Sequence, residues 1–400
     1  MYWYALLESS ADVGGTGKGK IDMTASCEAY TTIRMIRAAS HCNVAFAGGS
    51  LTAGVGATDT SITSWRRLFM RWLYERFHPV YHCQPSEIMG GIGAMESYGA
   101  VFTIGRNITP FIPSLVFVEF CVNDAGAPDK DLVRKGLEGI IRQCKAVSTN
   151  PDVVFVGAGM RPEEGSTTGA CDFSIHREVA AHYGCGFIDV QDHIVRTLAA
   201  RGQTWDHVSI SFAENDRWHL NDYGNALWFE AVRDWFEEQW KRYDLNPTDD
   251  QYDWTLPAPI VSDELARTTL VDPSRRNRAI ALEGGWEPRD TAILPWYLDN
   301  ALVGRPGDRL VYTFTGSAIG AICMVHPNGL KLEAKLDGDA IPGPFTNFGI
   351  EFGKFFLMKH GLTDAEHTLE LEVAPPSRRQ NRLPDPTAQI GYLAVAGRSV

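Results

Sequence analysis

The chain has 400 residues, of which 44% are hydrophobic and 22% charged, a composition typical of a soluble globular protein of about two domains. Its formal net charge of −12 argues against a nucleic-acid-binding protein, which needs a basic face, and against adhesion to anionic lipid. No apolar run reaches about 18 residues, so no membrane span is predicted. We therefore expect a protein whose partner is neither nucleic acid nor a bilayer.

Residues 1–42 are interpreted as an N-terminal extension. The stretch GGTGKGK at 14–20 has the glycines of a phosphate-binding loop, but Ile21 stands where a Ser or Thr would hold Mg²⁺. No predicted strand precedes it, so a turn-rich segment is expected there. A helix is predicted over 27–40. The N-terminus has no basic start followed by a long apolar core, which favours a cytoplasmic location without excluding export.

Between residues 43 and 241, near-continuous hydrophobic runs alternate with amphipathic segments. Such runs are typical of parallel strands buried on both faces, and the amphipathic segments predict helices that cover the sheet. The predicted strands are 43–48, 114–121, 152–159 and 184–190, and the predicted helices are 61–77, 131–147, 173–184 and 225–243. This alternation predicts an α/β domain with a parallel sheet.

The pattern changes after residue 241. Residues 242–258 are rich in Pro and Asp and are interpreted as a linker. From residue 259 to 400, short segments with period-two alternation are separated by Gly, Pro and Asp, and no long helix is predicted. We expect an all-β domain there, a sandwich of jelly-roll type.

Ser50 follows the first predicted strand and two glycines, in the stretch AFAGGSLTAG. In open α/β sheets the functional crevice lies at the carboxyl ends of the strands, and glycines there allow a tight turn and the close approach of a substrate. This position suits a nucleophile. A helix N-cap is the alternative interpretation of Ser50.

Two further stretches carry groups that serve a nucleophilic serine. In VEFCVND, Asn123 follows a buried strand, where an amide can donate to an oxyanion, although Asn-Asp is also a common turn pair. In DRWHLND, Asp216 and His219 are three residues apart, so the carboxylate can orient the imidazole toward a hydroxyl. A surface pair is the alternative for these two residues.

Together these stretches resemble the SGNH, or GDSL-type, hydrolases, in the branch whose first block reads GGS. The blocks GGSLTAG, MGGIGAMES, VEFCVND and DRWHLND occur in the family's order, and the resemblance covers about residues 43–240. It implies a flavodoxin-like sheet and an esterase that needs neither a metal nor an organic cofactor. Gly49 departs from the pattern, because many members carry Asp there.

The resemblance also implies residue roles. Ser50 matches the nucleophile and, through its N–H, one oxyanion donor; Asn123 matches the side-chain donor. His219 matches the general base and Asp216 its orienting partner. The remaining donor is a backbone N–H of the second block, with Gly93 and Ala94 as candidates.

Other chemical readings of the sequence are weaker. Cys121 is a rival nucleophile, but no basic residue adjoins it in sequence to lower the pKa of its thiol. His78, His82 and Cys83 have the spacing of zinc ligands without a second ligand cluster, so packing or capping is expected for them.

The ester itself is inferred from the appended β-domain, a frequent companion of carbohydrate-active enzymes. We expect removal of a small acyl group, acetyl above all, from a sugar or polysaccharide. The alternatives are an esterase, thioesterase or acyltransferase acting on another ester, and a catalytically silent glycan-binding protein. The aromatic side chains Trp286, Trp296, Tyr297 and Phe345 are candidates for stacking on sugars, with core packing as the alternative. The β-domain is also a candidate for homo-oligomer contacts.

Overall fold

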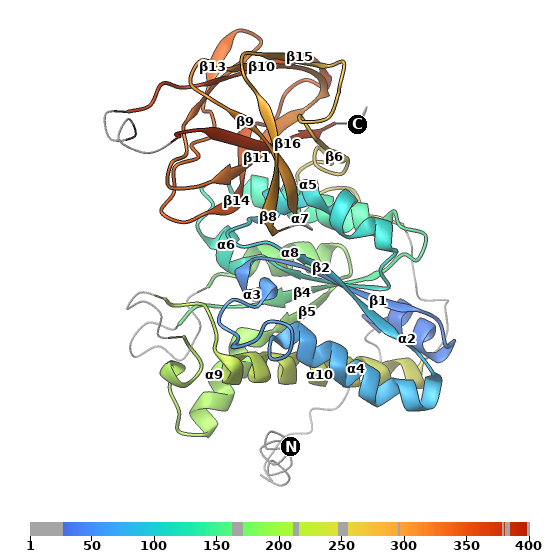
Figure 1. The fold of residues 1–400 in the computed structure, drawn as a ribbon. Helices are drawn as coiled ribbons and strands as arrows, with labels where there is room; N and C mark the ends of the chain where they lie inside the picture. The colour runs from blue at the N-terminus through green and yellow to red at the C-terminus, as the bar shows by residue number, and fades with distance from the viewer. Residues whose placement is uncertain are drawn as a thin grey trace.

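The computed structural model describes residues 27–161, 171–210, 216–246, 255–294, 297–377, 380 and 385–397. They fold into an α/β domain with a parallel sheet and a C-terminal domain made of antiparallel sheets (Figure 1). The fold class predicted from the sequence is thereby confirmed. The phosphate-loop-like stretch at 14–20 lies outside the described residues.

The parallel sheet has the strand order β2-β1-β3-β4-β5. The first strand, β1, lies next to the edge of the sheet; the chain moves from it to β2 at the edge and then returns past β1 to β3. The loops after β1 and β3 therefore leave in opposite directions and open a crevice at their carboxyl ends, where ligands bind in this kind of sheet. The strands are β1 (Cys42–Gly48), β2 (Pro85–Gly91), β3 (Leu115–Glu119), β4 (Asp152–Gly157) and β5 (Gly186–Asp189).

Helices cover both faces of this sheet (Figure 1). One face is covered by α2 (Tyr30–Arg37), α4 (Trp65–Tyr81), α9 (Val190–Ala200) and α10 (Asp222–Leu245), and the other by α5 (Ser97–Asn107), α7 (Lys130–Lys145) and α8 (Ser174–His182). Short helices α3 (Ser50–Ala53), η2 (Thr109–Phe111), α6 (Cys121–Ala125) and η3 (Trp205–His207) complete the domain. Trp65 of α4 and Trp228 of α10 stack with ring centroids 5.1 Å apart and anchor the first face.

Helix α2 belongs to the α/β domain, although residues 1–42 were predicted to be an extension. Ile33 and Ile36 are fully buried in the core beneath the sheet. The buried carboxylate of Asp152 accepts hydrogen bonds from the backbone N–H groups of Thr31 and Thr32, at 3.1 and 2.8 Å. The predicted boundary at residue 43 therefore falls inside the domain, because the helix predicted over 27–40 supplies part of its core.

The C-terminal domain consists of two antiparallel sheets that enclose a separate core. One sheet has the order β13-β12-β15-β10-β7 and the other β14-β11-β16-β9-β8, with β6 paired to β16. The strands are β6 (Thr268–Val271), β7 (Ile280–Glu283), β8 (Glu287–Leu294), β9 (Leu298–Gly304), β10 (Arg309–Gly316), β11 (Ala318–Val325), β12 (Leu332–Leu336), β13 (Asp339–Ile341), β14 (Phe352–Lys359), β15 (Ala365–Val373) and β16 (Ala388–Ala396).

Strand β11 shows how the two domains share apolar surface. All of its residues are buried, because the residues of one side enter the β-domain core and those of the other side face the α/β domain. Ile319, Ala321 and Cys323 belong to the first set, and Ala318, Ile322 and Met324 to the second. Phe355 of β14 stacks on Phe102 of α5 with centroids 5.2 Å apart. The β-domain is thus packed on the helical layer around α5.

The described part of the segment between the domains is hydrogen-bonded to helix α7. Glu138 of α7, which is fully buried, accepts hydrogen bonds from the backbone N–H groups of Ile260 and Val261. Before that, the carbonyl of Pro257 accepts from Arg142 at 2.5 Å. The predicted linker 242–258 therefore begins inside α10 and ends as a segment bonded to α7; residues 247–254 lie outside the described residues.

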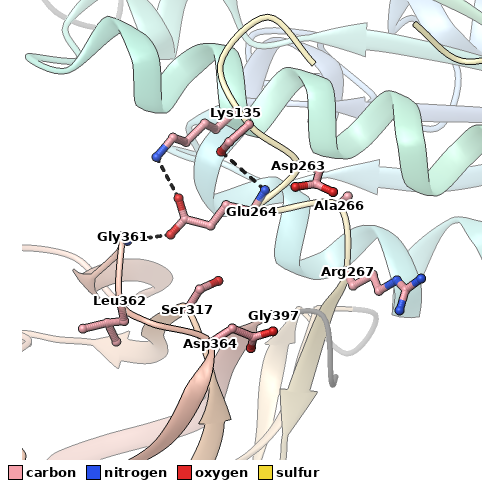
Figure 2. Close-up of a pocket in the computed structure, with 11 residues that line it drawn as sticks. Lys135, Asp263, Glu264, Ala266, Arg267, Ser317, Gly361, Leu362, Asp364 and Gly397 are labelled. Atoms are coloured by element: carbon pink, nitrogen blue, oxygen red, sulfur yellow. Dashed lines mark hydrogen bonds and ion pairs between the residues drawn. The ribbon is translucent and has the colours of Figure 1, made fainter. Parts of the chain in front are cut away.

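A cavity of about 620 Å³ lies at the domain junction, lined by residues of α7, the segment before β6, and turns of the β-domain (Figure 2). Lys135 of α7 reaches Glu264 at 2.7 Å, and Glu264 also accepts from the N–H of Gly361. These contacts join the domains across the cavity. None of the four sequence blocks that carry the candidate chemistry lines it.

Candidate active site

Ser50 stands at the turn from β1 into α3. Positions 48 and 49 require glycine because neighbouring atoms lie too close for a side chain. A Cβ on Gly48, for example, would lie 2.2 Å from Thr52 Oγ1 and 2.8 Å from the carbonyl oxygen of Glu119. The Ser50 hydroxyl is 2.8 Å from Nε2 of His219. Among the described residues, the backbone N–H of Ser50 has no acceptor, so it is available to a bound group.

His219 is held by Asp216 within a single turn. Its Nδ1 is 2.7 Å from Oδ2 of Asp216, and its backbone N–H donates to Oδ1 at 3.0 Å. Burial acts to raise the pKa of the Asp216 carboxyl, but hydrogen bonds from His219 and from the N–H of Trp218 outweigh it and hold that pKa below its usual value. Asp216 is therefore ionised near neutrality and accepts the Nδ1–H hydrogen bond of His219, which leaves Nε2 facing the Ser50 hydroxyl.

Hydrogen bonds hold the Asp216–His219 turn in place. Within it, the carbonyl of Arg217 accepts from the N–H of Arg161 at 2.6 Å. After it, the side chain of Asn221 accepts from the N–H of Gly224 at 3.0 Å and caps α10. The start of a 24-residue helix thus fixes the turn that carries the imidazole.

Asn123 lies in α6, directly after β3, and its amide reaches the nucleophile turn. A Cβ added to Gly49 would lie 2.2 Å from Oδ1 of Asn123 and 3.2 Å from its Cγ. The Asn123 side chain therefore occupies the space that a Cβ at position 49 would need.

Gly49→Ala is expected to leave the fold intact and to lower kcat by about 10²-fold, similar to Asn123→Ala, because the new Cβ pushes the amide aside. Ester hydrolysis and thermal unfolding should be measured together. Gly126→Ala is the matched control, since a Cβ there meets nothing within 4 Å and activity should be unchanged. Full activity of the Gly49→Ala protein would contradict the placement of Asn123 at the reacting centre.

The second block approaches the same edge of the sheet. The N–H of Ile92 donates to the carbonyl of Gly48 at 2.9 Å, which ties the block to β1. Ala94 has φ 55°, a left-handed conformation that is rare for a residue with a Cβ and is concentrated at functional sites. Among the described residues, the N–H groups of Gly93 and Ala94 have no acceptor. Both remain candidates for the second backbone donor.

Glu119 is a buried residue of the site that the sequence analysis missed. It ends β3, is 1% exposed, and accepts a hydrogen bond at 2.9 Å from Thr52, two residues after Ser50. Its own carbonyl accepts from the N–H of Gly49 at 3.1 Å. Burial raises the pKa of the carboxyl from 4.5 to about 8, although the hydrogen bonds from Thr52 and neighbouring backbone oppose the rise. Glu119 thus supports the nucleophile turn in its neutral form.

The protonated Glu119 makes stability depend on pH. The folded protein keeps this proton up to about pH 8, whereas the unfolded chain releases it near 4.5, so folding takes up a proton in this window. Stability is therefore expected to fall as pH rises from about 4.5 to about 8 and then to level off. Glu119→Gln mimics the neutral acid and should flatten this dependence in urea unfolding across the window. The exposed control Glu366→Gln should keep the wild-type slope; an equal slope in Glu119→Gln would contradict the protonation state.

The rival readings receive no structural support. Cys121 is 1% exposed, and burial raises the pKa of its thiol well above its usual value, so it is a poor nucleophile. His78 Nδ1 lies 2.9 Å from the carbonyl oxygen of Cys83, which is a capping contact at the end of α4. Within the described part of the chain no group of three or more His, Cys, Asp or Glu side chains is arranged to hold a metal ion. None of its helices is long and apolar enough to cross a membrane.

Residues 46–227 match the family described as GDSL-like lipase/acylhydrolase, with all four blocks inside the matched range. The chain contains a GDSL-like acylhydrolase domain. Its reaction class is therefore the hydrolysis of carboxylic esters. No curated protein sequence matches the chain.

Solved structures extend the likeness to both domains. The chain is similar to a two-domain esterase (CEX) active on acetylated mannans, co-crystallised with mannopentaose, at 18% identity and a TM-score of 0.77. The alignment covers 94% of this chain and 96% of that one. A second structure of a two-domain esterase (CEX) active on acetylated mannans gives a TM-score of 0.74 at 18% identity, with 94% and 99% covered. The acylhydrolase domain and the β-domain together thus form a known two-domain fold.

Proposed function

We propose that the acylhydrolase domain is a serine esterase that works through an acyl-enzyme on Ser50. The observation that carries this proposal is the continuous hydrogen-bonded chain from Ser50 Oγ through His219 to Asp216, with distances of 2.8 and 2.7 Å. Each group lies at the sheet edge where an open α/β fold binds its ligands. A helix-capping role for Ser50 would not require an imidazole aligned by a carboxylate.

The proposed chemistry follows from the roles of these atoms. His219 Nε2 takes the proton of Ser50 as Oγ attacks the ester carbonyl, and the negative oxygen is held by the N–H of Ser50, the amide of Asn123 and a second-block N–H. Collapse expels the alcohol, which receives the proton from His219. Water then attacks the acyl-enzyme with His219 again as base, and the acid leaves.

We propose acetyl groups on carbohydrate, and mannan-type chains first, as the substrate. The support is the likeness across both domains to an esterase whose substrates are acetylated mannans. The β-domain also lies close to the second block, since a Cβ on Gly99 of α5 would meet Met95 and Phe355 of β14, each at 2.7 Å. The loop that leads into β14 exposes Phe345 and Phe348, which are suited to contact sugar rings.

Two of the aromatic residues singled out in the sequence are not available for this contact. Tyr297 is fully buried between the domains, which corrects the expectation that it could stack on a sugar. Trp286 packs against the β-domain core and donates from Nε1 to the carbonyl of Arg309 at 3.1 Å. Trp296 lies outside the described residues. Phe345, with 52% of its surface exposed, remains the candidate.

The test measures acetate release from acetylated manno-oligosaccharides and acetylated xylo-oligosaccharides, and p-nitrophenol release from p-nitrophenyl acetate and octanoate, for wild type and Ser50→Ala. Ser50-dependent release that is fastest on the mannan substrate is the expected result. A preference for octanoate would replace the carbohydrate proposal with a lipid esterase, and transfer of acetyl to an added sugar would indicate a transferase. Binding of the oligosaccharide without turnover would favour a silent glycan-binding protein.

A further inference from the structure

The aspartate that follows Asn123 has a buried partner that no sequence block contains. Asp124 and His176 have side chains that are 1% and 3% exposed, and Nε2 of His176 is 3.1 Å from Oδ2 of Asp124. His176 comes from the first half of α8, 52 residues further along the chain. A buried carboxylate needs hydrogen-bond donors, and the imidazole supplies one of them.

The other carboxylate oxygen of Asp124 joins a different segment. Its Oδ1 accepts from the backbone N–H of Ser97 at 2.9 Å. Ser97 is the first residue of α5 and follows directly on the second block, where Gly93 and Ala94 are the candidate donors. The preceding residue, Glu96, makes no side-chain cap, so Asp124 satisfies a helix N-terminus from another part of the chain.

The backbone around Asp124 is fixed as well. Its N–H donates to the carbonyl of Phe120 at 2.8 Å, and its carbonyl accepts from Nζ of Lys130 at 3.5 Å. Asn123 therefore directly precedes an anchored residue. Asp124 thus adjoins Asn123 in the sequence, and its side chain binds the backbone N–H of Ser97.

We propose that His176 is a positioning residue that, through Asp124, couples the two segments carrying the oxyanion donors. The carboxylate bonds α5 with one oxygen and α8 with the other, so the distance between the Asn123 amide and the second-block N–H groups is set by this junction. His176 touches no reacting atom. Its role as a determinant of rate rests on the proposed function, whereas the coupling itself rests on the contacts alone.

Removal of the imidazole leaves one oxygen of a buried carboxylate unpaired, and Asp124 is then expected to turn away from Ser97. A displacement of about 1 Å at an oxyanion donor costs up to about 10²-fold in rate. His176→Ala is therefore expected to lower kcat by about 10- to 100-fold with KM within about twofold of wild type. His176→Gln can place an amide N–H where Nε2 lies, and it should restore most of the rate.

The experiment combines hydrogen-exchange mass spectrometry of the unliganded protein with acetyl-ester kinetics. His176→Ala should speed exchange in both 89–97 and 120–126 and leave α10 unchanged, while His176→Gln should return both segments toward wild type. The matched control is His326→Ala, which removes another buried histidine, paired with Gln389 in the β-domain, and should leave both segments and kcat unchanged.

Faster exchange in only one segment, or an equal loss of kcat in His326→Ala, would overturn the coupling. If His176→Ala does not fold, the comparison of His176→Gln with Asp124→Asn decides the point, since only the former keeps both bonds of the carboxylate. A wild-type protein without turnover on any ester would overturn the proposed function alone, because the exchange pattern decides the coupling separately.

Discussion

Ser50→Ala is expected to lower kcat on p-nitrophenyl acetate and on acetylated oligosaccharides by at least about 10⁴-fold. The variant removes the only hydroxyl within hydrogen-bond distance of His219 Nε2 among the described residues. Because the Ser50 hydroxyl makes no other hydrogen bond in that part of the chain, thermal stability should stay close to that of the wild type.

Two comparisons separate loss of the nucleophile from other causes of lost activity. Steady-state kinetics should be compared with thermal unfolding of the same preparations, so that lost activity is separated from lost fold. The neighbouring hydroxyl variant Thr52→Val serves as a comparison, because Thr52 contacts Glu119 rather than His219. Activity of Ser50→Ala within tenfold of wild type would show that another group is the nucleophile.

Asp216→Asn is expected to lower kcat by about 10³- to 10⁴-fold with little change in KM. The amide that replaces the carboxylate donates toward Nδ1 of His219, which forces the proton onto Nε2. That nitrogen then faces Ser50 as a donor and cannot take the hydroxyl proton. The loss should appear in both acylation and deacylation, because His219 is the base in each step.

Asp222→Asn is the matched control for this variant. Asp222 lies in the same stretch of sequence, but its carboxylate accepts from Thr58 and Thr63 and contacts neither His219 nor Ser50. Its kcat should remain within a few-fold of wild type. If both aspartate variants lose activity equally, the effect of Asp216→Asn comes from disruption of the loop and not from the imidazole tautomer.

The sequence predicted those helices and strands whose hydrophobic pattern matches the way their faces are covered in the fold. Strands β1, β3 and β4 are continuous apolar runs because both faces of a parallel sheet are covered. Strand β2 was missed: its sequence PSEIMGG carries Pro, Glu and two glycines, which are tolerated because it is an edge strand. Its glycines pack against Ile108 and α3, contacts that no local pattern reveals.

The candidate site was predicted to the extent that it lies in the four blocks. Ser50 and Asn123 meet at one sheet edge, as their strand-end positions indicated, and Asp216 and His219 reach Ser50 from the turn before α10. Glu119 and His176 were missed, because a carboxylate at the end of an apolar strand and a histidine on an amphipathic helix carry no local signature of their function. Each has its role only through partners far away in sequence, at separations of 67 and 52 residues.

The most direct measurement of the central claim is the detection of the acyl-enzyme. Wild type is mixed with p-nitrophenyl acetate and quenched in acid within milliseconds, whereas Asp216→Asn, in which acylation and deacylation are both slow, is quenched after longer incubation. Both are then digested with pepsin and analysed by mass spectrometry. Acetyl on the peptide that contains Ser50, absent from Ser50→Ala, is the predicted result. Acetyl on another residue in an active enzyme, or turnover without any acetylated peptide in either protein, would contradict a mechanism in which Ser50 is the acyl acceptor.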